Sequence, residues 1–432
     1  MSANPGQSDS TGSRLHYWCL AIIGLAIALR LAAMVLFTSH SSEDIDAYRG
    51  IAEGIFEGRG YCSPNSDSPT AYRPPLYPLL LAASLPLGPA GMALLHTGLA
   101  ALMLRWHWQS ARQLGMDGSG LVLSLALLGL DPLLIWYGTY PMTEALCAAL
   151  SAGMLAMLTS QSGSTHRTSL LTGMMFGLCV LARPTYWVWG ALLLTGLISS
   201  LKRSPQLPAN QQTLNQRHTL AVGLGVLLLV GPWALRNWLV LGHPVVMTTH
   251  GGYTLLLANN PSFYQHEVQQ PWGTIWTGPE FDAWSADLTK QLDASGLTSE
   301  VEVDRHESRI AQKFIQENPL AFLQACGHRL AMFWNITPNG PVRDQIPASL
   351  LWLLGGVYLM WWLLALSGAV QVICRRAWKW WPVLSLILAY CAIHSVYWSN
   401  MRLRAPIMPA VALLAGTSIS RRKSAESVEV AS

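Results

Sequence analysis

Long apolar stretches separated by short polar breaks recur along almost the whole chain. The first runs over Leu15–Phe37, close to the roughly 20 residues that an α-helix needs to cross the hydrocarbon core of a bilayer. Similar stretches follow at Ala90–Trp106, Leu121–Tyr137, Glu144–Thr159, Ser169–Leu181, Tyr186–Ser199, Leu220–Leu235, Leu350–Val370, Trp381–Trp398 and Pro406–Ser418. The pattern predicts an all-α polytopic membrane protein with about ten transmembrane helices.

Pro75–Leu87 is also apolar, but it is short and framed by prolines. We interpret it as an interfacial or re-entrant helix, because all later loops would change sides if it crossed the membrane. Leu15–Phe37 is longer than the apolar region of a cleaved signal peptide, and many similar stretches follow it, so we interpret it as the first span. The polar residues 1–13, rich in Ser and Gly, predict a disordered tail.

The positions of Lys and Arg orient these spans, because cytoplasmic loops of membrane proteins are enriched in both. With Arg14 in the cytoplasm, every second loop is basic, and the opposite loops hold most of the acids. The basic residues of the predicted cytoplasmic loops are Arg105, Arg112, Arg167, Lys202, Arg203, Arg217, Arg375, Arg376, Lys379, Arg421, Arg422 and Lys423. Both termini are therefore predicted to be cytoplasmic.

Composition agrees with this interpretation. Of the 432 residues, 51% are hydrophobic and only 12% are charged, whereas a soluble domain carries about 25% charge. A water-soluble enzyme and a nucleic-acid binder are thereby excluded. The seven Cys include no CxxC pair, so we interpret them as small core residues rather than as a disulfide framework.

The predicted topology divides the chain into consecutive parts. These are the tail 1–13, an N-terminal transmembrane module 14–236 that includes the first external loop 39–74, a large external region 237–348, C-terminal helices 349–419 and a cytoplasmic tail 420–432. The first loop is predicted to contain an amphipathic helix on the membrane surface, since apolar residues recur at helical spacing from Ile45 to Phe56. The large region is predicted to contain helices over Ser299–Asn318 and Pro319–Trp334.

Acidic residues lie at positions where chemistry is possible. Asp44 and Asp46 lie at or just before the start of the first-loop helix, where one of them could instead cap that helix. Glu144 lies in the first turn of a span, where the helix dipole alone could account for it. Asp131 lies within a span before Pro132, and it could be functional or belong to an Asp-Pro kink.

Arginines gather on the same side as these acids. They are Arg30, Arg73, Arg183, Arg236, Arg402 and Arg404. Each alone could be a snorkelling side chain. Together with the acids they suggest a site for an anionic lipid head group, because the planar guanidinium donates paired hydrogen bonds to phosphate. A transporter could use the same groups.

Several short motifs run in a defined order along the chain. They are Asp44-Ile-Asp-Ala-Tyr48, Arg73-Pro-Pro-Leu-Tyr-Pro, Pro141-Met-Thr-Glu144, Leu181-Ala-Arg-Pro-Thr, Trp233-Ala-Leu-Arg-Asn, Asn259-Asn260-Pro and Arg402-Leu-Arg404-Ala-Pro. With this set the chain resembles the GT-C glycosyltransferases, in particular the family 39-like bacterial members related to protein O-mannosyltransferases and to the lipid A aminoarabinose transferase. The set is specific for the superfamily and not for one substrate.

This resemblance implies a GT-C-type bundle and an inverting glycosyltransferase. A monosaccharide would pass from a polyprenyl-phosphate donor to a lipid, glycan or protein acceptor on the external face of the membrane. Asp44, four residues before Tyr48, would be the catalytic base, with Asp46 as its rival and Glu144 as a second acidic position. Arg404 and Arg402, with Arg236 or Arg183, would bind the donor phosphate. Tyr48, Arg73, Tyr77 and Asn259 would line the substrate cleft.

No metal-binding motif is present, so no cofactor is predicted, although a divalent metal stays open. The predicted location is a bacterial inner membrane, with the site on the periplasmic side. The alternative function is a transporter or flippase for a lipid-linked sugar. Such a protein would need polar residues through several spans, whereas here they gather at one surface, with Asp131 as the main exception.

Overall fold

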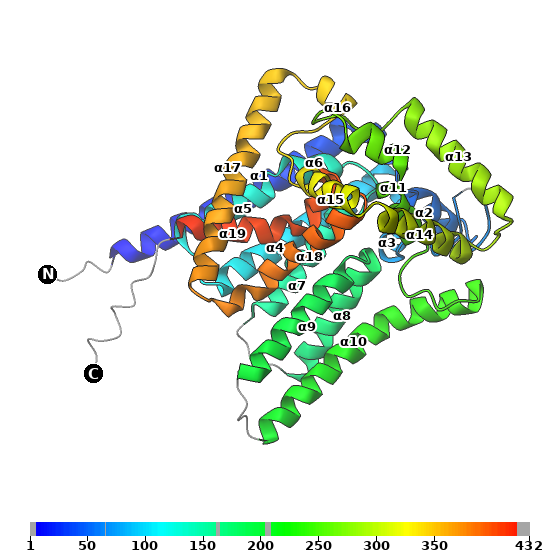
Figure 1. The fold of residues 1–432 in the computed structure, drawn as a ribbon. Coiled ribbons are helices and arrows are strands. Elements are labelled where there is room, and N and C mark those ends of the chain that lie inside the picture. The colour runs from blue at the N-terminus through cyan, green and yellow to red at the C-terminus, as the bar shows by residue number, and fades with distance from the viewer. Residues whose placement is uncertain (1–5, 65, 161–164, 204–208, 421–432) are drawn as a thin grey trace.

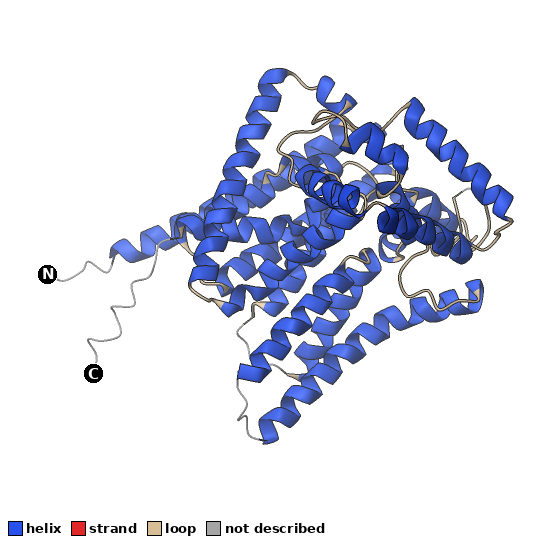
Figure 2. Ribbon diagram, in the orientation of Figure 1, coloured by secondary structure: helices blue, strands red, loops and turns tan. Residues whose placement is uncertain are grey.

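In the computed structural model of the chain, the described residues are 6–64, 66–160, 165–203 and 209–420. These residues form helices joined by turns and loops (Figure 2), and their β-pairing is limited to an isolated bridge between Cys62 and Pro69. The predicted all-α class is therefore confirmed. Residues 1–5 and 421–432, which include parts of both predicted tails, lie outside the described residues.

A bundle of apolar helices makes up most of the molecule (Figure 1). Helix α1 begins and α19 ends on the left of this view, whereas α11 to α14 gather at the upper right. The bundle helices are α1 (Gly6–Leu36), α4 (Pro89–Gln113), α5 (Gly118–Gly129), α6 (Pro132–Tyr137), α7 (Glu144–Leu158), α8 (His166–Ala182), α9 (Tyr186–Arg203), α10 (Ala209–Leu241), α17 (Ala348–Cys374), α18 (Trp381–Val396) and α19 (Met408–Ile419).

Four segments within the described residues are long and apolar enough to cross a membrane. They are Leu15–Leu36, Gly118–Tyr137, Gln216–Leu241 and Ala348–Cys374. The other predicted spans also lie in helices, namely α4, α7, α8, α9, α18 and α19, but these do not meet the same measure of length and composition. The four candidate spans indicate a multi-pass membrane protein.

Two predicted segments differ in detail from the structure. The first helix begins at Gly6, inside the stretch predicted to be a disordered tail. The predicted span Leu121–Tyr137 is interrupted, because Asp131 caps α6 by accepting a hydrogen bond from the Leu133 N–H at 3.0 Å. Pro132 then occupies the first position of α6, where its missing N–H costs nothing. The Asp-Pro kink is thus present.

The proline-framed stretch forms a short helix, α3 (Leu76–Ser84), followed by the turn η2 (Leu85–Leu87). The nine residues of α3 extend over only about 14 Å, less than half of the roughly 30 Å hydrocarbon core. Gly88, with a φ of 57°, reverses the chain before α4, and α3 packs against α2 and α4. A non-spanning helix fits these lengths.

One end of the bundle carries the segments 38–75, 242–347 and 397–407, and we call it the loop end. Its elements are η1 (Thr38–Ser42), α2 (Tyr48–Phe56), α11 (Gly251–Ala258), α12 (Pro261–Phe263), η3 (Tyr264–Val268), α13 (Pro279–Ser295), α14 (Glu300–Glu317), α15 (Pro319–Phe333), α16 (Pro341–Asp344) and η5 (Met401–Ile407). The helices predicted within 45–56, over 299–318 and over 319–334 are confirmed by α2, α14 and α15. Helix α13 protrudes from the rest of the molecule (Figure 1).

The large loop region has small apolar cores separate from the main core of the bundle. One core consists of Leu255, Leu256, Leu288 and Ala311, and the other of Phe263, Tyr264, Trp276 and Ala325. Burial of these side chains stabilises the region by the hydrophobic effect. The region can therefore hold its helices in fixed positions above the bundle.

Close contacts between helices depend on glycine. A Cβ atom added at Gly368 of α17 would lie 1.9 Å from the carbonyl oxygen of Leu414 on α19. Small residues let helix backbones approach closely in a membrane, where packing rather than water exclusion drives association. The α17–α19 contact therefore requires glycine at this position.

We expect Gly368→Ala to lower the free energy of unfolding by about 1–3 kcal/mol, the usual cost of overpacking. Gly356→Ala on the same helix is the matched control, because an added Cβ there meets nothing within 4 Å. The apparent unfolding temperature in detergent measures both variants. Equal unfolding temperatures for the two variants would show that the α17–α19 contact is looser than described.

Candidate active site

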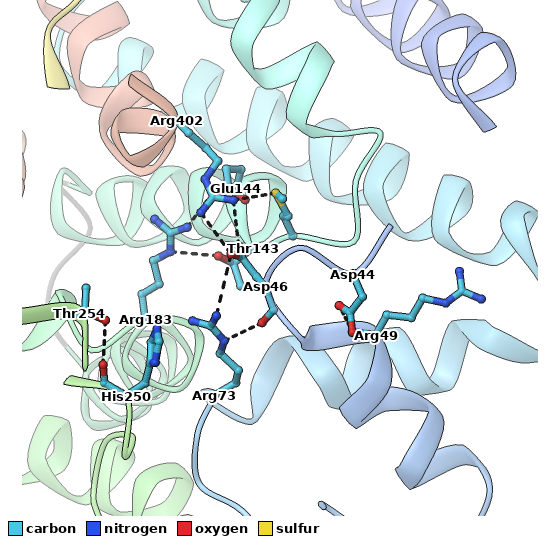
Figure 3. A network of polar contacts seen from close by, with 11 residues as sticks. Asp44, Asp46, Arg49, Arg73, Thr143, Glu144, Arg183, His250, Thr254 and Arg402 are labelled. Atoms are coloured by element: carbon cyan, nitrogen blue, oxygen red, sulfur yellow. Dashed lines mark hydrogen bonds and ion pairs between the residues drawn. The ribbon is translucent and has the colours of Figure 1, made fainter. Parts of the chain in front are cut away.

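Charged side chains from four separate segments meet at the loop end (Figure 3). They are Asp46, Arg73, Glu144, Arg183 and Arg402, and we call them the arginine–carboxylate cluster. Two come from the first loop, Glu144 begins α7, Arg183 follows α8, and Arg402 lies in η5. Three guanidinium groups face two carboxylates, so the cluster retains one unbalanced positive charge.

Glu144 is fully buried at the start of α7. Its Oε1 accepts a hydrogen bond from Nη2 of Arg183 at 2.8 Å and lies 3.4 Å from Nε of Arg402. Nε of Arg183 also donates to the Thr143 hydroxyl at 3.0 Å. A buried carboxylate requires such partners, because removing one leaves an uncompensated charge. Among the described residues, Oε2 of Glu144 is buried and has no hydrogen-bond partner.

The two arginines that face Glu144 lie where helical structure is interrupted. Helix α8 ends at Ala182, and Arg183 adopts an extended conformation before Pro184, as residues before proline usually do. Arg402 belongs to η5, whose start is capped by the Asn400 side chain accepting the Arg402 N–H at 3.0 Å. Both side chains can therefore leave a helix end and point into the cluster.

Asp46 joins the first loop to the cluster. Its Oδ2 accepts a hydrogen bond from Nη1 of Arg402 at 2.9 Å, and Oδ1 lies 3.9 Å from Nη2 of Arg73. Nε of Arg73 donates to the Asp46 carbonyl at 2.7 Å. Burial opposes ionisation of Asp46, but Arg402 and Arg73 outweigh it and hold the pKa of this carboxyl below its usual range. Asp46 is therefore an anion at neutral pH.

Asp44 has a different environment. Its Oδ1 accepts the N–H of Arg49 at 2.8 Å and its Oδ2 accepts the N–H of Gly50 at 2.7 Å, so it satisfies N-terminal donors of α2 as a capping carboxylate does. In Figure 3, Asp44 lies on the side of Asp46 away from Arg183. Of the two aspartates, the structure brings Asp46 into the cluster and gives Asp44 the capping contacts.

Arg402 and Arg404 also separate. Arg404 is fully buried, donates to the carbonyls of Phe333 and Asn335, and lies 4.5 Å and 4.8 Å from the ring centroids of Tyr358 and Trp362. The hydroxyl of Tyr358 in turn donates to Asp131 at 2.6 Å. Arg404 thus points into the bundle, and the structure does not bring it to the cluster.

Arg236 and Asn259 connect backbone segments. Arg236 donates to the carbonyls of Thr70 and Tyr61, each at 2.7 Å, and so attaches the first loop to α10. Asn259 donates to the carbonyls of Leu255 and Val396, both at 2.9 Å. Both residues join segments of the loop end, and none of their hydrogen bonds described here is to a residue of the cluster.

Two predicted cleft residues, Tyr48 and Tyr77, pack against each other beside Arg73. The guanidinium of Arg73 lies 5.2 Å from the Tyr48 ring centroid, and the rings of Tyr48 and Tyr77 meet edge to face at 5.3 Å. The Tyr77 hydroxyl is hydrogen-bonded to Nε2 of His96 at 2.8 Å. These contacts place both predicted cleft residues next to the cluster.

Three neighbours of the cluster were not singled out from the sequence. They are Thr143 and His250, both labelled in Figure 3, and Tyr72, whose ring centroid lies 4.9 Å from the guanidinium carbon of Arg73 and 4.3 Å from the His250 ring centroid. Thr143 and Tyr72 directly precede Glu144 and Arg73, so attention to the neighbours of predicted residues could have found them. His250 lies far along the chain, and only the fold brings it here. Among the described residues, no group of three or more His, Cys, Asp or Glu could hold a metal ion.

No family model matches the chain, and neither does any curated protein. Among solved structures, the chain is similar to the crystal structure of ArnT from Cupriavidus metallidurans bound to undecaprenyl phosphate. The match has 14% sequence identity, covers 94% of this chain and 78% of that chain, and has a TM-score of 0.40. ArnT lies within the GT-C class that the motifs resemble. At this identity and TM-score, function has to be inferred from the side chains themselves.

We expect Asp44→Ala to lower the free energy of unfolding by about 1 kcal/mol, the typical cost of losing a helix cap. Asp44→Asn should cost less, because its amide oxygen still accepts one of the two backbone N–H groups. Glu43→Ala is the matched control, since Glu43 is the exposed neighbour. Chemical denaturation or apparent unfolding temperature measures the three. A loss in Asp44→Asn as large as in Asp44→Ala would contradict the capping role.

Helix α14 contacts the first loop, where the Glu300 carboxylate accepts hydrogen bonds from the Thr70 hydroxyl and the Ala71 N–H, and it carries a second acidic group with an altered pKa. Burial, and then the nearby Asp304, raise the pKa of Glu307 to about 7. In the unfolded chain the pKa returns to about 4.3, so the folded state binds this proton more tightly. The contribution of Glu307 to stability therefore falls as pH rises from about 4.3 to 7 and stays low above that range.

We accordingly expect Glu307→Gln to raise the apparent unfolding temperature relative to the unmodified protein at pH 8 but not at pH 5. Glu302→Gln, at an exposed position of the same helix, should give no such pH-dependent difference. A difference for Glu307→Gln that is constant from pH 5 to pH 8 would mean that its carboxyl titrates outside this range.

Proposed function

We propose that this protein is an integral-membrane inverting glycosyltransferase of the GT-C type. It moves a monosaccharide from a polyprenyl-phosphate donor to a hydroxyl of a lipid, glycan or protein acceptor. The observation that carries the proposal is the arginine–carboxylate cluster, in which an ionised carboxylate lies among three arginines at one end of an apolar helix bundle. Such a site offers both a phosphate clamp and a base.

The arginines suit a lipid phosphate. A guanidinium has five N–H donors, and the hydrogen bonds to Asp46 and Glu144 use only part of those on Arg73, Arg183 and Arg402. The unbalanced positive charge attracts an anion, and the low polarity of the bundle strengthens that attraction. A phosphate bound there would displace Asp46 from Arg402 in part, which would return basicity to Asp46.

Asp46 is the proposed base. The acceptor O–H proton passes to the Asp46 carboxylate, and the oxygen attacks the anomeric carbon from the face opposite the phosphate. The bond between the anomeric carbon and the phosphate oxygen breaks, and the polyprenyl phosphate leaves with the electron pair. Arginines aimed at that oxygen stabilise the growing charge, and one preorganised donor is worth about 3–4 kcal/mol. The anomeric centre is inverted.

Glu144 acts through its neighbours in this proposal. By pairing with Arg183 and lying 3.4 Å from Arg402, it holds both guanidinium groups where the phosphate binds. Arg404 and Arg236 hold η5 and the first loop in place. Of the four arginines that the resemblance assigns to the donor phosphate, this proposal keeps Arg402 and Arg183. It adds Arg73 in place of Arg404 and Arg236.

The proposed topology has ten spans, formed by α1, α4, the α5–α6 pair, α7, α8, α9, α10, α17, α18 and α19. Both ends of the chain then lie in the cytoplasm, and the loop end lies on the periplasmic side of a bacterial inner membrane. Short α2, α3 and α15 lie at the interface. The basic loops between spans support this orientation.

A transporter or flippase for a lipid-linked sugar is the alternative. The observation in its favour is the buried polar group formed by Arg30, Asp131 and Arg404 inside the bundle, since intramembrane charges often mark a transport path. Arg30 donates to the carbonyls of Ala26 and Gly129, and Arg404 is held as described above. These contacts tie the polar group to the backbone, which favours the transferase.

We expect Arg402→Ala to weaken binding of undecaprenyl phosphate by at least about tenfold, the equivalent of 1.4 kcal/mol. Arg59→Ala is the matched control, because Arg59 is a first-loop arginine that pairs with Glu57 and Asp67 rather than with a cluster residue among the described residues. Native mass spectrometry of the purified protein with added undecaprenyl phosphate measures both. Equal binding by the two variants, or binding of a free sugar in place of the lipid, would favour the transporter.

We expect Asp46→Asn to bind undecaprenyl phosphate at least as tightly as the unmodified protein, because Arg402 loses its anionic partner. Transfer from an undecaprenyl-phosphate monosaccharide should fall by roughly 10²–10⁴-fold, the usual contribution of a general base. Asp44→Asn is the control and should retain most of the activity. The reverse pattern, with Asp44→Asn inactive and Asp46→Asn active, would assign the base to Asp44.

A further inference from the structure

His250 reaches the cluster from the large loop region. It directly precedes α11, and the N–H of its neighbour Thr249 donates to the carbonyl of Ala71 at 3.1 Å. This backbone contact joins the start of α11 to the first loop. Figure 3 shows the His250 side chain on the side where Arg73 and Arg183 lie and away from Asp44.

Two tyrosine rings flank the imidazole of His250. The ring centroid of Tyr72 lies 4.3 Å away, and that of Tyr253 lies 5.3 Å away in a stacked arrangement. The Tyr72 ring also lies 4.9 Å from the guanidinium carbon of Arg73, which contacts Asp46. Continuous contacts therefore lead from His250 through Tyr72 and Arg73 to the proposed base.

One nitrogen of this imidazole is unused. Among the described residues, Nδ1 of His250 is buried and has no hydrogen-bond partner. The hydroxyl of Thr254 donates to the backbone carbonyl of His250 at 2.8 Å, not to its imidazole. Leaving a buried polar atom unpaired costs roughly 1–3 kcal/mol. Next to a substrate site, a ligand group is the natural partner for such an atom.

The imidazole is neutral. Burial, and then the positive charge of Arg73, lower the pKa of His250 well below its usual range, and Asp46 opposes this only in part. A neutral imidazole has one N–H donor and one nitrogen whose lone pair accepts a hydrogen bond, and with the proton on Nε2 the accepting nitrogen is Nδ1. Because it carries no charge beside the arginines, it does not compete with them for phosphate.

The surroundings suit a sugar better than a phosphate or a lipid tail. Tyr72 and Tyr253 are each partly exposed, and aromatic faces give a carbohydrate ring a large contact area with a fixed orientation. A site that hydrogen-bonds a substrate hydroxyl discriminates strongly against analogues that lack it, because its polar atom is then left unpaired. Rings and nitrogen together thus provide contact and selectivity.

We propose that Nδ1 of His250 accepts a hydrogen bond from a sugar hydroxyl and selects sugars that present one between Tyr72 and Tyr253. The proposal rests on the proposed function. The hydroxyl belongs either to the donor monosaccharide or to the acceptor, and the chemistry at His250 is the same for both. His250 therefore determines which sugar is accepted, while the arginines bind the common phosphate.

The test uses the full chain in lipid nanodiscs, with His250→Ala, His250→Asn and His250→Gln. The side-chain amide of Asn reaches the position of Nδ1, and that of Gln reaches the position of Nε2. For each variant, the affinity is measured for undecaprenyl phosphate alone and for each member of a panel of undecaprenyl-phosphate monosaccharides. Release of undecaprenyl phosphate from the panel in native membranes, which contain the acceptor, reports transfer.

We expect all variants to bind undecaprenyl phosphate as the unmodified protein does and to keep its unfolding temperature. Transfer should fall about tenfold in His250→Ala and His250→Gln and recover in His250→Asn. If the hydroxyl is the donor's, the affinity for the sugar-bearing lipid falls in the same variants. If it is the acceptor's, that affinity is unchanged and only transfer falls.

Equal transfer by His250→Ala and the unmodified protein would overturn the inference, and so would recovery by Gln rather than Asn. A parallel loss of undecaprenyl phosphate binding and unfolding temperature in all three variants would also overturn it, since that shows a structural role. Failure of the unmodified protein to bind undecaprenyl phosphate would instead overturn the proposed function, and this inference with it.

Discussion

The loop end depends on the pairing of buried carboxylates with arginines. Glu144 is fully buried, and a lone carboxylate in such a place would cost several kcal/mol. Arg183 and Arg402 offset that cost, and Arg402 extends the pairing to Asp46. Because these residues come from α7, the α8–α9 break, η5 and the first loop, the requirement for charge compensation fixes four distant segments relative to one another.

Two short motifs, one in the first loop and one in η5, each contain two charged residues with different roles. In the first loop, Asp44 caps α2 while Asp46 turns toward the arginines. In η5, Arg402 faces the cluster while Arg404 points into the bundle. One member of each pair thus holds its segment in place, and the other presents its charge to the site.

Much of the fold follows from local sequence, and less of the site does. Apolar stretches and helical spacing were enough to predict the all-α bundle, the helix α2 and the helices α14 and α15. The Asp131-Pro132 break was anticipated as one of two interpretations. The site could be predicted as a set of acids and arginines at one end, because the motifs place them there. Which aspartate and which arginine face the cluster could not be predicted, since that depends on turns such as Ala47, whose φ is 61°, and on the 3-10 geometry of η5.

The position of η5 near the C-terminal end has a consequence for biogenesis. Arg402 is translated after every bundle helix except α19, so Asp46 and Glu144 lack this arginine while the earlier helices insert. The cluster is completed only when η5 docks between the first loop and α7. The full charge compensation of the cluster is therefore reached only after α18 has been translated, and until then Glu144 has Arg183 and Asp46 has Arg73 as its arginine partner.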